Sequence, residues 1–298
     1  MQLSRTQFDI LMLLEKEKEN KNLTQRSIAR LCGLSLGTVN KTMSHLTDTG
    51  LAANNVITKA GLKALEPYRV TRAVFIAAGF GSRLVPITLN TPKPLVRVKG
   101  IRIIDTLLDA ICGLGIKDII IVRGYLSEQF DQLKYKYPDI QFIENPIYNE
   151  SNNIASMMYV RHLLKNAYVL ESDLLLGNPE IITKYQYTSN YLGIPVERTD
   201  DWCFETRNGI ITKVKVGGCN CHQMVGISYW NNTYGEKLSE HIKQVFEMPG
   251  GKERYWDQVP LEYFIKDYDV EVRECKKEDI LEIDNFSELV SVDKAYKI

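Results

Sequence analysis

The sequence predicts an α/β protein, in which a mostly parallel or mixed sheet with covering helices follows a small domain of short helices and one hairpin. Residues 1–66 show the apolar spacing of helices, whereas from residue 72 onward short apolar runs alternate with amphipathic stretches. Such alternation is typical of parallel sheets with short loops. Residues 66–71 contain Pro67 and form a linker too short for free tumbling. The 298 residues therefore predict two domains, 1–66 and 72–298.

The composition is that of an ordinary globular protein, with 44% apolar and 25% charged residues. The 37 basic and 37 acidic residues cancel, so no overall field attracts the chain to nucleic acid or to a membrane surface. No apolar run approaches the ~18 residues of a membrane span, and the N-terminus lacks the apolar core of a signal peptide. Six cysteines form no dense framework. We therefore expect a cytoplasmic protein with no membrane partner.

Capping residues and glycines divide the first 50 residues into three helices. We expect Thr6, Thr24 and Ser35 to cap these helices, because each precedes apolar residues at spacings of three and four. Gly33 ends the second helix, and Gly50 ends the third.

A hairpin and a last short helix complete the small domain. Residues 51–53 and 56–58 flank Asn54-Asn55, which is a favourable hairpin turn, and the helix runs to Leu65. This order of elements, together with residues 23–29 and 33–39, resembles a winged helix-turn-helix domain of the MarR type.

The MarR-type resemblance implies that the third helix enters the major groove of DNA. Its polar face is only mildly basic, however, and winged helices also serve as protein-contact or dimerisation modules. DNA binding, a structural or regulatory role, and a homodimer therefore all remain open. The residues that would face DNA are Thr38, Asn40, Lys41, Ser44 and His45.

The larger domain alternates strands and helices after a first apolar strand at residues 73–78. We expect helices at Ile103–Cys112, Ser127–Lys136 and Asn153–Leu164, and strands at Asp118–Val122, Gln141–Glu144 and Ala167–Leu170.

A glycine-bearing turn directly follows the first strand of the larger domain. It begins at Ala78 and includes Gly79, Gly81 and Ser82, so backbone N–H groups can approach phosphate oxygens there. Arg83 and Lys93, the latter between two prolines, are side chains suited to a triphosphate. The chain contains no P-loop string, and Leu84 stands where a dinucleotide fingerprint needs its third glycine. These features predict a nucleotide site.

The combined string from Ala77 to Leu95 resembles the signature loop of nucleotidyltransferases, which couple a nucleoside triphosphate to a phosphorylated alcohol or sugar. The resemblance implies a Rossmann-like nucleotidyltransferase domain. It also implies that the two glycines approach the phosphates, while Arg83 and Lys93 act on the α-phosphate and the leaving pyrophosphate.

An acid stands just beyond the predicted strand at residues 167–170. Asp173 lies where the ligand crevice of an open parallel sheet is found, and carboxylates are ligands that Mg²⁺ prefers. We expect Asp173 to be a catalytic residue and a magnesium ligand. The nucleotidyltransferase resemblance implies a second ligand from late in the domain, Asp284. Glu171 either lies around the metal ligands without binding the ion itself or is simply a residue of the strand.

Residues 148–157 are rich in amide and hydroxyl groups, which suit the neutral edge of a nucleobase. A turn followed by a helix cap is the alternative. With the preceding tyrosine, Asn152, Asn153 and Ser156 resemble the corresponding segment of bacterial CTP:phosphocholine cytidylyltransferases, which implies that they bind the nucleotide.

The resemblance to that cytidylyltransferase family extends through residues 72–298. It includes all three tryptophans, and aromatic faces with a nearby carboxylate are how proteins hold quaternary ammonium groups. The alternative is that the tryptophans belong to the core, and we expect only two or three of the aromatics to line a pocket. The predicted acceptor-binding residues are Trp202, Trp230, Tyr255, Trp256 and Asp257.

The sequence therefore predicts an enzyme that transfers CMP from CTP to phosphocholine, releasing pyrophosphate, with Mg²⁺ as cofactor. Phosphoethanolamine, 2-aminoethylphosphonate or a sugar 1-phosphate are alternative acceptors. A transcription regulator whose larger domain senses a nucleotide without catalysis is an alternative of another class.

Overall fold

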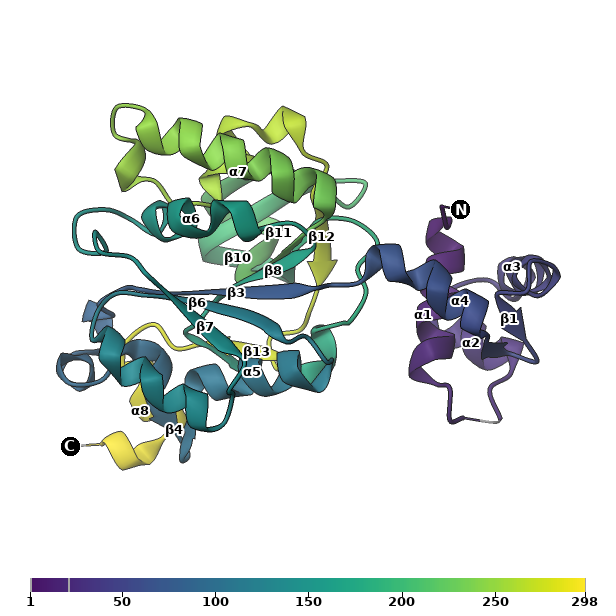
Figure 1. Cartoon of the computed structure of the whole chain (residues 1–298), viewed down its shortest axis with the longest axis horizontal. Coiled ribbons are helices and arrows are strands. Elements are labelled where there is room, and N and C mark those ends of the chain that lie inside the picture. Colours follow the sequence, from purple (N-terminus) through teal and green to yellow (C-terminus); the bar gives the residue numbers. More distant parts are fainter. Residues whose placement is uncertain (1, 21, 298) are drawn as a thin grey trace. The chain divides into compact units, whose positions relative to one another are not determined.

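The computed structural model describes residues 2–20 and 22–297, and the chain forms two compact units (Figure 1). The first unit contains the chain up to Arg69 together with Tyr185–Tyr187. The second contains Val70–Lys184 and the chain from Thr188 onward.

The first unit contains the helices and the hairpin that the sequence predicts. They are α1 (Arg5–Lys16), α2 (Gln25–Leu31), α3 (Leu36–Asp48), β1 (Ala52–Ala53), β2 (Val56–Ile57) and α4 (Lys59–Leu65). Asn54 and Asn55 have φ angles of 51° and 59°, as a tight primed turn requires. Thr24 and Ser35 cap α2 and α3 as predicted.

The prediction that Thr6 caps the first helix is wrong. Ser4 is the cap, because its extended backbone lets its side chain accept a hydrogen bond from the Gln7 N–H, while the Gln7 side chain accepts one from the Ser4 N–H. Two backbone N–H groups at the helix start are satisfied in this way.

A short segment from far along the sequence completes the core of the first unit. Tyr185 is 2% exposed, and the ring of Tyr187 stacks on Tyr68 at 5.6 Å between centroids. The remaining core is apolar and comes mainly from the helices, including Phe8, Leu11, Leu14, Ile28, Val39, Met43 and Leu46.

The second unit is built on a seven-stranded sheet in the order β10-β12-β11-β8-β3-β6-β7. Strands β8, β3, β6 and β7 are parallel, whereas β11 runs antiparallel to β8 and pairs with β10 in a long antiparallel ribbon. The predicted mostly parallel, mixed sheet is therefore confirmed. The strands are β3 (Arg72–Ala77), β6 (Asp118–Arg123), β7 (Ile140–Glu144), β8 (Ala167–Glu171), β10 (Asn190–Arg207), β11 (Ile210–Trp230) and β12 (Glu271–Glu274).

Helices cover both faces of this sheet. Figure 1 shows α6 and α7 on one side and α5 on the other, and two separate apolar clusters fill the two interfaces. The predicted helix at residues 127–136 is a 3₁₀ helix instead, Ser127–Tyr135, whose buried residues Phe130 and Leu133 lie three apart. The α-helices are α5 (Ile103–Gly113), α6 (Ile154–Val160), α7 (Asn232–Glu247) and α8 (Phe286–Val292).

Two small two-stranded sheets flank the main one. Strand β4 (Arg97–Val98) pairs with β5 (Ile101–Arg102), and β9 (Leu174–Leu176) pairs antiparallel with β13 (Ile280–Glu282). The second pairing brings the chain near residue 282 beside the chain that follows β8. Among the described residues, no helix is both long enough and apolar enough to cross a bilayer.

Candidate active site

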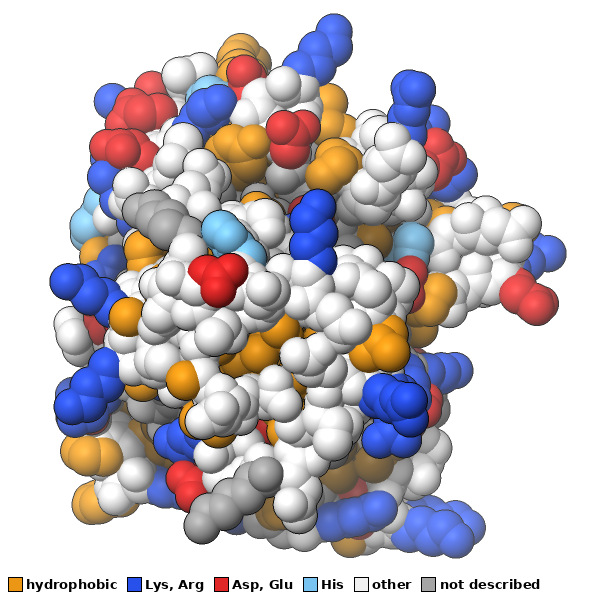
Figure 2. Space-filling view, turned by 90° about the vertical axis from the view of Figure 1, so that its right-hand side faces the viewer, with side chains coloured by type: hydrophobic (Ala, Val, Ile, Leu, Met, Phe, Trp, Pro, Cys, Tyr) orange, Lys and Arg blue, Asp and Glu red, His pale blue; other side chains and the backbone are white. Residues whose placement is uncertain are grey.

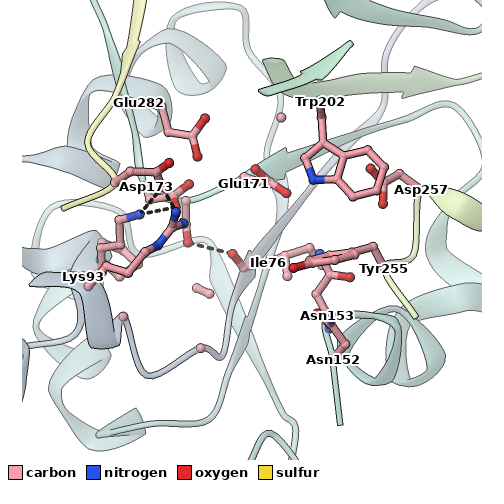
Figure 3. A pocket seen from close by; sticks show the side chains of 18 of the residues that line it. Ile76, Lys93, Asn152, Asn153, Glu171, Asp173, Trp202, Tyr255, Asp257 and Glu282 are labelled. Carbon is pink, nitrogen blue, oxygen red and sulfur yellow. Dashed lines mark hydrogen bonds and ion pairs between the residues drawn. The ribbon is translucent and has the colours of Figure 1, made fainter. Parts of the chain in front are cut away.

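A pocket of about 670 Å³ lies at the carboxyl ends of β3 and β8, where the sequence predicts the nucleotide site (Figure 3). The glycine turn after β3, the acids after β8, the loop before α6 and part of β10 and β11 supply its walls. Carboxyl ends of parallel strands form such ligand crevices because the connecting loops diverge there.

The glycine turn is shaped by Gly81, whose φ of 69° lies in the left-handed region. A Cβ atom at Gly81 would also come within 3.1 Å of the Lys93 side chain and 3.2 Å of Thr88. A side chain at residue 81 is therefore both strained and crowded. A Cβ at Gly79, in contrast, would meet open space. Both glycines line the pocket together with Ser82 and Arg83, whereas Ala78 lies just behind the wall and is 3% exposed.

Lys93 is the buried cation of the site. It is 7% exposed, and its Nζ donates to Asp173 Oδ2 at 2.6 Å and to Asp284 Oδ1 at 3.4 Å. Burial alone would lower the pKa of Lys93, but the charges of Asp173 and Asp284 raise it overall. Lys93 therefore remains charged at neutral pH.

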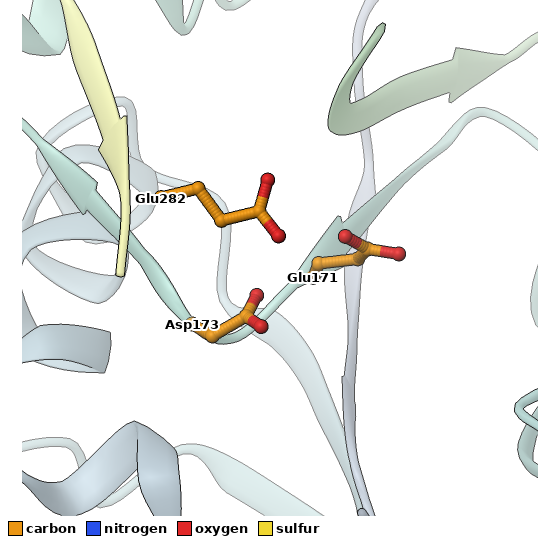
Figure 4. Close-up of side chains that lie close together, drawn as sticks. All are labelled: Glu171, Asp173 and Glu282. Carbon is orange, nitrogen blue, oxygen red and sulfur yellow. The ribbon is translucent and has the colours of Figure 1, made fainter. Parts of the chain in front are cut away.

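Three carboxylates lie close together in the pocket (Figure 4). Glu171, Asp173 and Glu282 each offer an oxygen within 4.8 Å of the others. Burial, and then the negative charge of Asp173, raise the pKa of Glu171 to about 8 and that of Glu282 to about 9. The Asp173 Oδ1 atom is buried and has no hydrogen-bond partner among the described residues. This arrangement of hard oxygen donors with an unsatisfied atom fits a divalent cation.

The predicted second ligand, Asp284, lies beside these carboxylates but is engaged differently. Its Oδ1 accepts hydrogen bonds from Arg83 Nη2 at 2.6 Å and from Lys93 Nζ at 3.4 Å, so this oxygen is paired with both cations of the site. Its role as a metal ligand stays a prediction. Glu282, two residues earlier, is the acid that the sequence reasoning did not choose.

The predicted aromatic residues divide into two sets. Trp202 and Tyr255 line the pocket, with their ring centroids 5.9 Å apart in an edge-to-face arrangement. Trp230 and Trp256 are 0% and 1% exposed and pack against each other in the core under α7. The prediction that Trp230 and Trp256 bind the acceptor is therefore wrong, and the alternative of core tryptophans applies to both.

Asp257 is a buried carboxylate at the aromatic end of the pocket (Figure 3). It is 9% exposed, and no residue in the part of the chain that the structure describes forms a hydrogen bond with its Oδ1. Burial raises the pKa of Asp257 to about 7, even though backbone N–H groups stabilise the charged form. A buried acceptor without a donor favours a ligand that brings one.

The amide-rich loop before α6 reaches the pocket through only two of its predicted residues. Asn152 and Asn153 line the wall. Ser156 is 1% exposed and its hydroxyl accepts from Asn145 Nδ2 at 3.0 Å, inside the protein. The prediction that Ser156 contacts the nucleotide is therefore not supported, because Ser156 is one of the buried residues of α6.

Comparisons with known proteins agree with this architecture. The family model described as nucleotidyl transferase matches residues 72–190, and the MarR family model matches residues 1–54. The chain is 32% identical to the 2-aminoethylphosphonate cytidylyltransferase of Lancefieldella rimae over 76% of this chain and 93% of that protein. It is also 32% identical to the choline-phosphate cytidylyltransferase of Streptococcus pneumoniae, over 76% of this chain and 98% of that protein. The chain belongs to the cytidylyltransferases.

Solved structures place this cytidylyltransferase in the same fold. The CTP:phosphocholine cytidylyltransferase from Streptococcus pneumoniae superposes with a TM-score of 0.69 at 32% identity, covering 77% of this chain and 100% of that one. The inositol-1-phosphate CTP transferase of T. maritima shares the fold alone, with a TM-score of 0.58 at 16% identity. The predictions of a nucleotidyltransferase and of a MarR-type domain are confirmed.

The MarR-type domain presents the polar face of α3 to solvent. All five residues predicted to face DNA are exposed, whereas Val39, Met43 and Leu46 on the opposite face are buried. On the face of the molecule in Figure 2, Lys and Arg side chains are scattered among acidic and neutral ones. The exposed residues are Thr38, Asn40, Lys41, Ser44 and His45.

Proposed function

We propose that this cytidylyltransferase transfers CMP from CTP to an acceptor that carries a phosphate or phosphonate at one end and an ammonium group at the other. The observation that carries the proposal is the polarity of the pocket. The cations Lys93 and Arg83 lie at one end, paired with the acids Asp173 and Asp284. Asp257 lies with Trp202 and Tyr255 at the other end (Figure 3).

A primary ammonium is the head group that this pocket favours. Such a group donates three hydrogen bonds, whereas a quaternary ammonium donates none and needs enclosing aromatic faces. Only two of the predicted aromatics line the pocket, and the buried carboxylate of Asp257 lines it as well. The first candidate is therefore 2-aminoethylphosphonate, the compound named for the Lancefieldella relative, and phosphoethanolamine has the same chemistry.

Phosphocholine, the acceptor expected from the sequence, is the second candidate. The edge-to-face pair of Trp202 and Tyr255 offers two ring surfaces to a methylated cation, with Asp257 nearby as its counter-charge. Similarity to the choline-phosphate cytidylyltransferase of Streptococcus pneumoniae supports this candidate. A sugar 1-phosphate has no cation to place against Asp257.

Transfer requires little covalent work from the protein. An oxygen of the acceptor's phosphate or phosphonate attacks the α-phosphorus of CTP, the bond to the bridging oxygen breaks, and pyrophosphate leaves. The acceptor oxygen is already anionic near neutral pH, so no general base is needed. Lys93 and Arg83 stabilise the negative charge that develops on the α-phosphate and the leaving group.

Mg²⁺ is the cofactor that we infer for this reaction. Glu171, Asp173 and Glu282 fit it by their oxygen donors and by the unsatisfied Asp173 Oδ1, and Asp284 is the further ligand expected from the sequence. When bound, the ion neutralises charge on the triphosphate. Lys93 orients Asp173 toward that position through its hydrogen bond.

A pyrophosphate-release assay with a panel of acceptors tests the proposed activity. With CTP and Mg²⁺, we expect the highest kcat/KM for 2-aminoethylphosphonate or phosphoethanolamine, a lower one for phosphocholine, and none for glucose 1-phosphate. A preference for the sugar phosphate would contradict the assignment of Asp257, and a preference for phosphocholine would select the second candidate.

DNA binding by the MarR-type domain is a second proposed function, supported by the exposed polar face of α3. The affinity for the protein's own promoter should fall steeply as the salt concentration rises. Lys41→Ala should reduce the slope of the logarithm of the binding constant against the logarithm of the salt concentration by about 1. Binding that stays at the level of unrelated DNA would leave the domain with a structural or regulatory role.

A further inference from the structure

Three hydrogen bonds join the loop before α6 to the segment that carries the acceptor end of the pocket, residues 252–257. The Asn152 N–H donates to the Lys252 carbonyl at 2.8 Å, and Asn152 Nδ2 donates to the Glu253 carbonyl at 3.3 Å. The Trp256 N–H donates to Asn153 Oδ1 at 2.9 Å. The two loops are about a hundred residues apart in sequence, and these bonds link them directly beside the pocket.

The chemistry of the partners determines how the two amide groups are oriented. A backbone N–H can only donate, so the atom of Asn153 that faces Trp256 is its oxygen. A carbonyl can only accept, so the atom of Asn152 that faces Glu253 is its nitrogen. The side-chain oxygen of Asn153 is therefore committed to the acceptor segment. Its Nδ2 donates to no other residue that the structure describes.

The Trp256 N–H lies between the two residues that form the acceptor end. Tyr255 precedes it and Asp257 follows it, and both line the pocket. The Trp256 side chain is anchored in the core at 1% exposure. The hydrogen bond from the Trp256 N–H to Asn153 Oδ1 ties the backbone of residues 255–257 to the loop before α6. Gln258 holds it from the other side, since Gln258 Oε1 accepts from the Tyr255 N–H at 3.0 Å.

We propose that Asn153 is a positioning residue for the acceptor site, holding Tyr255 and Asp257 in place through the Trp256 N–H, and is not a reader of the cytosine base. This inference rests on the proposed function, because it assigns the acceptor to the end of the pocket formed by residues 255–257. It gives Asn153 a role different from the nucleotide contact expected from the sequence.

Two substitutions separate the roles. Asn153→Ala removes both the oxygen and the amide nitrogen, whereas Asn153→Asp keeps an acceptor for the Trp256 N–H and removes the donor that a base reader would need. Aspartate has nearly the shape of asparagine, and a negative charge is favourable at the N-terminus of α6, so the variant is expected to fold.

Hydrogen exchange of the full-length protein tests the positioning role without any substrate. Peptides that span residues 252–258 should exchange faster in Asn153→Ala and at the wild-type rate in Asn153→Asp. Gln258→Ala serves as the matched variant and should also accelerate exchange there, because it frees the neighbouring Tyr255 N–H. Unchanged exchange in Asn153→Ala would overturn the inference.

Steady-state kinetics over a matrix of CTP and acceptor concentrations supply the second readout. Asn153→Ala should raise the acceptor KM about tenfold, as expected for one lost hydrogen bond at a partly buried donor. Its CTP KM and its preference for CTP over UTP should change less than about twofold, and Asn153→Asp should restore the acceptor KM. A raised CTP KM in both variants, with an unchanged acceptor KM, would show that Asn153 reads the base.

The two readouts keep the inference separate from the proposed function. If the wild-type protein transfers CMP to none of the acceptors, the proposed function fails, while the exchange comparison still decides the positioning role. Faster exchange with an unchanged acceptor KM would show that the acceptor does not bind at residues 255–257, and would overturn the inference.

Discussion

Replacing Asp257 by asparagine tests the acceptor end of the pocket, because the substitution removes a charge and keeps the shape of the side chain. The loss of a hydrogen bond to a charged group costs about 1.5–3 kcal/mol, which predicts a rise in acceptor KM of about 10- to 150-fold. The CTP KM should stay nearly constant. Asp201→Asn is the matched control, since Asp201 lines the same pocket but is exposed.

The pH dependence of the acceptor KM follows from the same carboxyl group. Burial raises the pKa of Asp257 to about 7, so the group is largely protonated below that pH and cannot pair with an ammonium. The acceptor KM of the wild-type protein should therefore fall as the pH rises from about 6 to about 8. The ratio of the variant's KM to the wild-type KM should rise over the same range.

Asp257→Asn should also make the ligand-free protein more stable. A carboxyl group whose pKa is raised by folding holds its proton more tightly in the folded state, so its ionisation lowers the free energy of unfolding as the pH rises. The increase in the Asp257 pKa from 3.8 to about 7 sets an upper limit of about 4 kcal/mol for this cost above neutral pH. A calorimetric Tm should therefore be higher for the variant at about pH 8, and the difference should vanish at acid pH. An unchanged acceptor KM together with an unchanged Tm would refute this reasoning.

Three further predictions concern the remaining parts of the site. Lys93→Ala and Asp173→Ala should each lower kcat by about 10³-fold or more, because they remove the cation and its carboxylate from the reacting centre; near-normal pyrophosphate release in both would reject the site. Trp202→Leu should raise the acceptor KM with little change in Tm, whereas Trp230→Leu should lower the Tm by leaving a cavity and so report its place in the core. Glu282→Gln should raise the Mg²⁺ concentration needed for half-maximal activity about tenfold, since the loss of one carboxylate at a metal site commonly lowers metal affinity by about that factor. An unchanged magnesium titration would remove Glu282 from the ligand set.

The features that the sequence predicted well are those decided by local chemistry. Thr24 and Ser35 cap their helices because a side-chain oxygen near a free N–H needs only neighbours in sequence. The hairpin at Asn54-Asn55 needs only two residues that tolerate positive φ. The glycine turn and Lys93 were also identified, because a strand, two glycines and a proline-flanked lysine form a contiguous pattern.

The choice between Glu282 and Asp284 could not be made from the sequence. Both acids lie in one short stretch, and their positions depend on the pairing of β9 with β13 across about a hundred residues. That pairing sets Glu282 opposite Leu174, next to Asp173, and leaves Asp284 beyond the end of the strand, where it meets Arg83. Two acids two residues apart at the end of a strand lie on the same side, so their spacing alone does not choose between them.

The assignment of Trp230 failed for a related reason, since it depends on which face of a strand the side chain occupies. Strand alternation would give that face only if the register were regular, because a slip of one residue moves every later side chain to the opposite face. In the long ribbon of β10 and β11, the register shifts between Thr199 and Trp202 and again at Cys203. These irregularities place Trp202 on the pocket, while Trp230, at the far end of β11, lies in the core under α7. The acceptor site that we propose beside this irregular ribbon therefore cannot be read from aromatic content alone. On that proposal, its specificity depends on how firmly the neighbouring loops hold Tyr255 and Asp257.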